Sequence, residues 1–200
     1  MSWTDLRNLI RERGKEAGFT LIEVLAAIVI LSIVSLVLTS YFTNALSYSK
    51  SNQNKTVMVN LARNALFYME KQDFEEMRDY FKVEDISPGA VHPDIKAAQC
   101  TAAVCNMKSE FINGEVLPEV LNPVINNIAY EVNITYQAEL HRNMMEGRSG
   151  NGSNDAPDPR KQDMAPYLIP VQVEVTGPGG PNANTASTVV EGYITDEKIR

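Results

Sequence analysis

The stretch that decides the fold is Gly18 to Leu38, GFTLIEVLAAIVILSIVSLVL, an apolar run with a single acid, Glu23, near its start. The apolar part, Phe19 to Leu38, contains 20 residues. As an α-helix rising about 1.5 Å per residue, it spans about 30 Å, which is the hydrocarbon thickness of a bilayer. The run is therefore long enough to cross a membrane once.

The composition predicts one ordinary folded domain with an accessory segment, since the chain has 200 residues of which 44% are hydrophobic. The net charge of -7 argues against a nucleic-acid partner, because binding to phosphates needs clustered Lys and Arg. We find no nucleophile with its base, no phosphate-binding loop and no metal-ligand motif in the sequence. We therefore expect neither an enzyme activity, nor a cofactor, nor a resident metal, nor direct binding to nucleic acid.

Charge on the two sides of the apolar run predicts its orientation. Four basic residues precede the run, at Arg7, Arg11, Arg13 and Lys15, whereas only Lys50 follows it closely. The positive-inside rule then predicts that the N-terminus lies in the cytoplasm and that the C-terminal part is exported. Three outcomes compete for this N-terminus: an uncleaved signal anchor, a secretory signal cut after the run, and a leader cut before it. The end of the run has no A-x-A-like site, which disfavours the second outcome.

Residues 18–25, GFTLIEVL, resemble the cleavage and methylation motif of type IV prepilins and type II secretion pseudopilins. That motif has a Gly at the cut, an aromatic residue at the new N-terminus and a Glu at the fifth mature position, heading an apolar helix. The resemblance implies removal of a cytoplasmic leader, residues 1–18, by the prepilin peptidase and methyltransferase. It also implies cleavage between Gly18 and Phe19 and N-methylation of Phe19.

Glu23 is the one acid in the predicted membrane span, residues 19–40. Placing a carboxylate at mid-bilayer costs about 2.5 to 3.5 kcal/mol. An acid in this run therefore suggests a functional role, and it needs a positively charged partner. Once Phe19 is the N-terminus, its ammonium lies one helical turn from Glu23, and the same ammonium on a neighbouring subunit is a candidate partner. The resemblance implies that this pairing docks subunits during assembly. The alternative is a Glu at the headgroup level of a plain anchor.

The same helix is predicted to continue beyond the membrane, because neither Gly nor Pro occurs from Phe19 through Ser87. Many pilins carry Gly and Pro at the positions that Ser32 and Ser40 occupy here. We expect a soluble continuation over residues 41–82, with a kink or a second short helix after about residue 72. An apolar stripe at spacings of three and four predicts the face that packs on a folded domain. Its residues are Met58, Leu61, Ala65 and Met69.

Residues 83–200 are predicted to form an exported β-sheet domain, which gives an α+β fold of the pilin type, a long helix packed against an antiparallel sheet. Alternating or short apolar runs mark the candidate strands. These are 104–112, 115–120, 128–138, 168–175 and 188–195, with Asn113-Gly114 as a hairpin turn between the first two. The polar segment 141–164 is rich in Gly, Asn and Pro and is predicted to be a mobile loop.

Cys100 and Cys105 are close enough in sequence to form a disulfide if this side of the run is exported. Two reduced thiols are one alternative. A zinc site is the other, although the only histidines, His92 and His141, are at no zinc spacing. The loop acids Asp155, Asp158 and Asp163 lack the spacing of a calcium loop.

The sequence thus predicts a minor pilin or pseudopilin of a type IV pilus or a type II secretion-like filament. It is expected to be a single-pass inner-membrane protein with its N-terminus in the cytoplasm, which after assembly becomes part of an extracytoplasmic filament. Its expected partners are the peptidase, other pilin-type subunits and the membrane. The alternatives are a component of a competence pilus for DNA uptake, and an extracytoplasmic enzyme or binding protein on a signal anchor.

Overall fold

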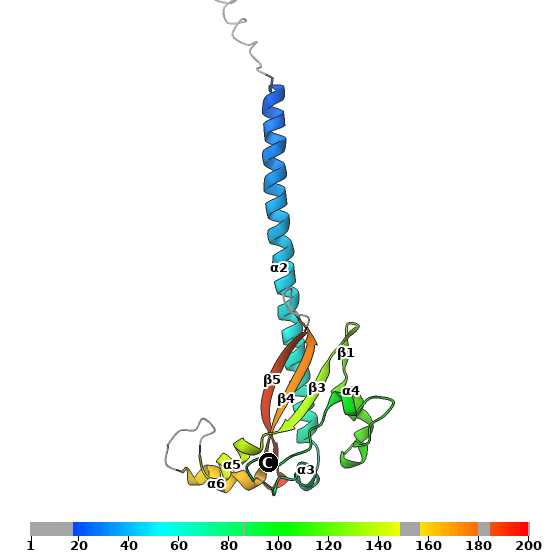
Figure 1. Cartoon of the computed structure of the whole chain (residues 1–200), viewed down its shortest axis with the longest axis vertical. Coiled ribbons are helices and arrows are strands. Elements are labelled where there is room, and N and C mark those ends of the chain that lie inside the picture. The colour runs from blue at the N-terminus through cyan, green and yellow to red at the C-terminus, as the bar shows by residue number, and fades with distance from the viewer. Residues whose placement is uncertain (1–17, 86, 149–156, 180–184, 200) are drawn as a thin grey trace, which may run out of the picture. The chain divides into compact units, whose positions relative to one another are not determined.

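A computed structural model describes residues 18–85, 87–148, 157–179 and 185–199. The predicted leader residues 1–17 lie outside this part of the chain, and so do their basic residues and Asp155. The chain divides into two compact units, Met1–Leu46 and Ser47–Arg200. The order of elements is α+β, as predicted, with a long helix first and antiparallel strands after it (Figure 1).

Helix α2, Leu21–Glu70, carries the apolar run in the first unit and continues into the second (Figure 1). No break occurs at Ser32, whose hydroxyl donates to the carbonyl of Ile28 at 2.7 Å within the helix. Among the described residues, α2 is the one helix that is long and apolar enough to cross a membrane. The uninterrupted helix follows from the absence of Gly and Pro in this part of the sequence.

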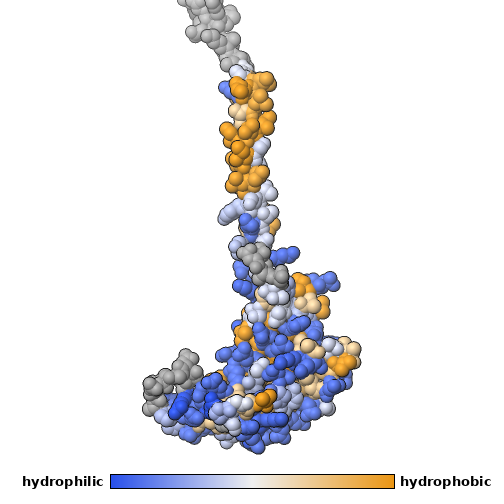
Figure 2. Space-filling model, viewed as in Figure 1, coloured by the Kyte–Doolittle hydropathy of each residue, from blue (hydrophilic) through white to orange (hydrophobic). Residues whose placement is uncertain are grey.

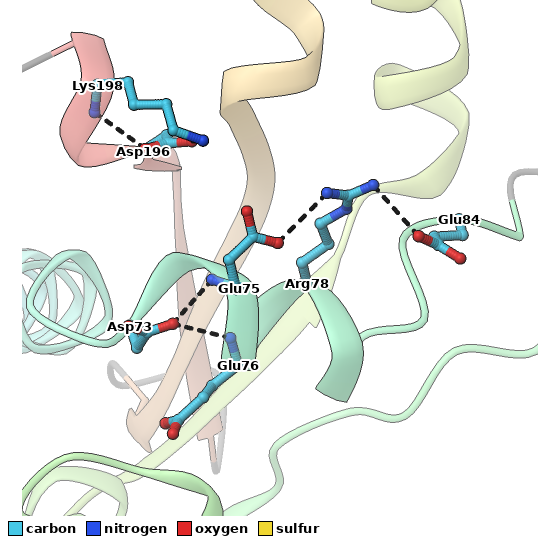
Figure 3. Close-up of polar contacts among 7 residues, drawn as sticks. All are labelled: Asp73, Glu75, Glu76, Arg78, Glu84, Asp196 and Lys198. Carbon is cyan, nitrogen blue, oxygen red and sulfur yellow. Dashed lines mark hydrogen bonds and ion pairs between the residues drawn. The ribbon is translucent and has the colours of Figure 1, made fainter.

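Helix α2 ends at Glu70, and a second short helix, α3 (Phe74–Tyr80), follows. Gln72 closes the end of α2, since its side-chain amide donates to the carbonyl of Tyr68 at 2.8 Å. Asp73 caps α3 by accepting from the backbone amides of Glu75 and Glu76 at 2.9 and 3.0 Å (Figure 3). Of the two predictions for this region, a kink or a second short helix, the second helix is therefore confirmed, and an aspartate cap begins it.

Two ion pairs lie on the surface of the second unit around α3 (Figure 3). Arg78 lies between Glu75 and Glu84, at 3.3 and 3.2 Å. Near the C-terminus, Lys198 pairs with Asp196 at 3.5 Å. All three pairs have at least one exposed side chain, and such pairs contribute little to stability.

The main sheet has the order β3–β4–β5 and is antiparallel throughout, with β3 at Glu131–Tyr136, β4 at Leu168–Pro178 and β5 at Thr185–Thr195. The alternation predicted for the strand 128–138 is confirmed over β3, because Val132, Ile134 and Tyr136 are buried, as is Tyr130 just before it. Ile128, on the same predicted face, is only partly buried. The sheet packs in the core with Met58, Ala62, Ala65 and Met69 of α2. Of the predicted stripe, Met58, Ala65 and Met69 are buried as expected, whereas Leu61 is only partly buried. Ala62, which was not predicted, is fully buried beside them.

Gly192 in β5 lies directly beneath the side chain of Leu66 on α2. A Cβ atom added at Gly192 would come closer to the end of this side chain than real atoms approach, so Leu66 would have to move. The glycine in the middle of this strand therefore marks a close contact between α2 and the sheet.

The predicted hairpin over 104–120 is wrong. This segment instead contains the short 3-10 helices Lys108–Glu110 and Gly114–Val116, followed by helix α4 at Leu117–Leu121. Leu117 and Leu121 are buried four residues apart, which is a helical spacing, and Pro118 suits the first turn of a helix.

The hairpin turn instead lies between β1, Val124–Ile125, and β2, Ile128–Ala129. Its two turn residues, Asn126 and Asn127, have φ of 51° and 62°. Both central residues of a type I′ turn need a positive φ, and asparagine tolerates it better than most residues.

The predicted loop 141–164 is wrong at both ends. Helix α5, Ala138–Met145, enters the segment, and helix α6, Pro159–Met164, closes it. Asp158 caps α6 through the backbone amide of Arg160 at 3.0 Å, and His141 on α5 is buried. The two ends are therefore ordered by a helix cap and by packing, whereas residues 149–156 lie outside the described part.

Candidate processing and assembly site

The predicted cleavage residues stand immediately before helix α2. Gly18 and Phe19 are exposed, and 88% of the surface of Phe19 is accessible. A Cβ atom added at Gly18 would contact nothing within 4 Å, and Gly18 is not among the glycines with a positive φ. Neither packing nor backbone conformation therefore requires a glycine at this position.

Glu23 lies in the first turn of α2 and is hydrogen bonded to Thr20, the residue before the helix. The backbone amide and the hydroxyl of Thr20 both donate to Oε2 of Glu23, at 2.8 and 2.9 Å. In return, the backbone amide of Glu23 donates to the hydroxyl of Thr20 at 3.3 Å. The two residues form a capping box, which satisfies two of the amides that a helix start leaves without partners.

Thr20 was not among the predicted site residues, although the pattern T-x-x-E before an apolar run is the signature of a capping box. This reciprocal pair gives Glu23 a local role in addition to any role between subunits. It holds the carboxylate at the first turn of the helix, on the side of Thr20.

Glu23 lies on the same side of the helix as several apolar residues. A shallow hollow of about 410 Å³ is lined by Phe19, Glu23, Val24, Ala27, Ile28 and Leu31. These residues recur at spacings of three and four, which places them on one face. All residues of the apolar run, Gly18 to Leu38, are exposed, and the surface of the run is mostly apolar (Figure 2). A helix surface of this kind is compatible with lipid or with another apolar helix.

The remaining predicted site residues lie in the second unit. Cys100 and Cys105 form the predicted disulfide. Asn122 holds the ring that the disulfide closes, because its side-chain amide donates to the carbonyl of Cys100 at 2.7 Å. Neither histidine lies beside this disulfide. Both instead make edge-to-face contacts with Tyr136, His92 at 4.9 Å and His141 at 5.8 Å between ring centroids.

Tyr136 and His141 resemble an acid–base pair but are both buried. The hydroxyl of Tyr136 lies 2.7 Å from Nδ1 of His141, and Nε2 of His141 lies 3.0 Å from the carbonyl of Ala165. Nε2 therefore donates to this carbonyl, and Nδ1 accepts from the tyrosine. Burial raises the pKa of Tyr136 and lowers that of His141. With both ring nitrogens engaged inside the core, this pair is a structural contact.

The second unit also has an open groove of about 520 Å³ between α5 and the solvent-facing side of the sheet. Its floor carries Thr135, Gln172 and Glu191 from three adjacent strands, and Glu139 lines its wall. No group of three or more potential metal ligands occurs in the part of the chain that the structure describes. Asp158 is engaged in capping α6.

Comparison with known proteins yields one match. Residues 13–39 match the family model described as the prokaryotic N-terminal methylation motif. No curated protein and no solved structure shows significant similarity to the chain. The match covers Gly18, Phe19 and Glu23 together with the apolar run, and it ends before the second unit begins.

Proposed function

We propose that the chain is a minor pilin or a pseudopilin, because its residues 13–39 match the prokaryotic N-terminal methylation motif. Its role is structural: it is one subunit of a type IV pilus or of a type II secretion-like filament. The observation that carries the proposal is the position of Gly18, Phe19 and Glu23 at the head of an apolar helix that is exposed along its membrane-length part.

Processing begins with the prepilin peptidase at the peptide bond between Gly18 and Phe19. Water is added across this bond, so that the leader ends in a carboxylate at Gly18 and the mature chain begins with the amine of Phe19. The methyltransferase then methylates this amine. The lack of any packing reason for a glycine at position 18 supports a requirement set by the peptidase.

Assembly then uses the face of α2 that carries Glu23. Thr20 holds Oε2 of Glu23 through two hydrogen bonds, and both residues lie after the cut, so the capping box is retained in the mature chain. The carboxylate is thereby held in a fixed position to receive the ammonium of Phe19 from a neighbouring subunit. The apolar hollow beside it receives side chains of the neighbouring helix. An unpaired carboxylate in an apolar environment is costly. Pairing Glu23 with the ammonium of Phe19 neutralises this charge, which favours the assembled state.

The same proposal sets the location and the partners. The unassembled protein spans the inner membrane once through α2, with its leader in the cytoplasm and the second unit exported. The disulfide between Cys100 and Cys105 supports an oxidising compartment for that unit. The alternative is that the filament is a competence pilus for DNA uptake, in which this subunit would have the same structural role. Its net charge of -7 disfavours direct binding to DNA, so other components of such a filament would bind it.

The test is the incorporation of Glu23→Ala into filaments sheared from cells. We expect the variant to be processed and inserted in the membrane like the wild type, but to be depleted from the filament fraction by about tenfold or more. Ser32→Ala is the matched control, since it removes a hydroxyl from the same helix without changing any charge. Normal incorporation of Glu23→Ala, with the control also normal, would contradict the proposed docking role.

A further inference from the structure

In the described part of the second unit, two strand edges have no other strand paired to them, and they lie at opposite sides of its β-structure. Strand β5 pairs with β4 along one edge, and no described strand pairs with the other. Strand β1 pairs only with β2, which leads through Tyr130 directly into β3. Because β3 is the outer strand on the side away from β5, β1 and β5 lie on opposite sides of the sheet (Figure 1).

The edge of β5 lacks the features that usually protect an exposed strand. Its eleven residues, TASTVVEGYIT, include no Pro and no Lys, and Glu191 is the only charge. The pairing with β4 is continuous from Thr185 to Thr195, so no bulge bends the edge away. Val189 and Tyr193 face solvent, with 47% and 40% of their surfaces accessible. A long, regular and nearly uncharged edge is a template for adding another strand.

The edge of β1 presents unpaired backbone groups at Val124. The amide of Tyr130 donates to the carbonyl of Pro123 at 3.0 Å, and the next pair along the ladder is Val124 with Ala129. In an antiparallel ladder, hydrogen-bonded and non-hydrogen-bonded pairs alternate, so the N–H and C=O of Val124 point away from β2. The side chain of Val124 is also 62% exposed.

Two segments on the flank that carries β1 have no charged residue. Residues 121–130, LNPVINNIAY, contain no acid and no base, and neither does the disulfide ring 100–105, CTAAVC. Asn122 joins the two segments through its hydrogen bond to Cys100. Figure 2 shows apolar surface over the β1 hairpin and over the loop beside it. In a chain of net charge -7, these uncharged segments reduce the like-charge repulsion that another copy meets here, and depletion of charge is typical of interface cores.

The strand directions of the two edges are complementary for copies in the same orientation. Strands β3 and β5 run the same way, because each is antiparallel to β4. Strand β2 runs into β3, and β1 is antiparallel to β2, so β1 is antiparallel to β5. A second copy shifted sideways without being turned over therefore presents its β1 antiparallel to β5 of the first. Antiparallel pairing is the slightly more stable arrangement.

We propose that the free edge of β1 in one copy pairs with the free edge of β5 in a second copy of this chain. This inference rests on the proposed function, because a filament built on parallel helices holds its subunits in the same orientation. The contact is heterologous, since it joins different surfaces of the two copies. Contacts of this kind propagate along a filament instead of closing into a dimer.

The test is photo-crosslinking in cells that make the full-length chain with two distinguishable tags. One copy carries the substitution Val124→p-benzoylphenylalanine, and irradiation should join it to the second copy within Thr185–Thr195, as mapped by mass spectrometry. Val91→p-benzoylphenylalanine is the control, since Val91 is 88% exposed but belongs to neither strand. Val189→Lys in the second copy should lower the adduct yield by about fivefold or more, since a charge on an edge strand opposes pairing.

The variant Val189→Lys keeps the fold, because position 189 faces solvent and lies opposite Glu174, with which a lysine forms a cross-strand ion pair. Val91→Lys should leave the yield unchanged. Adducts of position 124 with a different protein, with lipid alone, or outside β5 would overturn the inference, as would the absence of any adduct.

The two proposals fail in distinguishable ways. If the chain is present in sheared filaments but yields no adduct with β5, the pairing is wrong and the proposed function stands. If the chain never enters filaments, the proposed function is wrong. In that case, the same irradiation of the full-length chain in membranes still tests the pairing of β1 with β5, because the adduct with β5 is either present or absent.

Discussion

The two ends of helix α2 have opposite surroundings within the same chain. In the second unit, the face that includes Met58 and Met69 is completely buried against the sheet. In the first unit, the apolar residues from Leu21 to Leu46 have no such partner, and Leu31 is 66% exposed. Both segments are regular helix, so the difference lies in what covers them and not in their backbone.

In the second unit, the chain's own sheet covers the apolar face of α2. In the first unit, another molecule must cover it. Large apolar side chains that remain exposed along a whole helix mark a surface for lipid or for another protein. The second unit has a core of its own, to which the apolar run contributes none of the buried residues. Changes in the run should therefore affect insertion and assembly, and changes in the core should affect folding.

The largest effect on folding is expected from Met69→Ala. This side chain is fully buried, and removing a buried methionine side chain costs about 2 to 5 kcal/mol of unfolding free energy. The measurement is urea unfolding of the full chain in detergent, followed by tyrosine fluorescence. Leu31→Ala is the matched control and should leave the unfolding midpoint of the second unit unchanged. A similar loss for both variants would break the distinction between the two segments.

A smaller effect is expected from removing the disulfide with Cys100→Ser and Cys105→Ser. Closing a ring of this size restricts the unfolded chain by about 2 kcal/mol in the chain-entropy model. We expect that loss in urea unfolding, whereas insertion of α2 in membranes, measured by carbonate extraction, should not change. Loss of insertion would show that the two units do not behave independently.

The smallest effect is a pH dependence that His141 gives to the second unit. Burial is the main cause that lowers the pKa of His141 in the folded state, and the positive charge of Arg78 adds to it. The unfolded state therefore binds the proton more readily. The stabilisation is complete above the unfolded pKa of about 6.5 and is lost as the pH falls below it. At pH 5.5, the loss from this residue is at most about 1.4 kcal/mol.

The measurement for His141 is the urea midpoint of the wild type and of His141→Asn at pH 7.5 and pH 5.5. The variant should be less stable at pH 7.5, because Tyr136 loses its hydrogen-bond acceptor, but its midpoint should change less between the two pH values. An equal change in both proteins would assign the pH dependence to other groups.

The sequence allowed correct predictions where one periodicity extends over many residues. The long helix follows from an apolar run without Gly or Pro, and β3 from the alternation that buries Val132 and Ile134. Residues 104–120 were predicted wrongly, because short apolar runs are equally compatible with strands and with buried helical turns. There, the helical spacing of Leu117 and Leu121 decided the structure.

Other features depend on contacts between distant residues and have no local signal. The polar helix α5 is ordered by the burial of His141 beside Tyr136 and Ala165, which the composition of the segment does not reveal. At the candidate site, the resemblance to the prepilin motif implied the roles of Gly18, Phe19 and Glu23, and it could do so because that motif is contiguous in sequence. Thr20 was not predicted, although it had a local signal as well, the capping-box pattern.

The most direct test of the account is the N-terminus of the chain in cells with an active prepilin peptidase. Mass spectrometry of the membrane and filament fractions should find a chain that begins at Phe19 and carries a methyl group on its amine. Gly18→Leu should leave the precursor uncut, with its leader still joined to Phe19. A wild-type chain that retains its leader, or a Gly18→Leu variant that still begins at Phe19, would contradict the account.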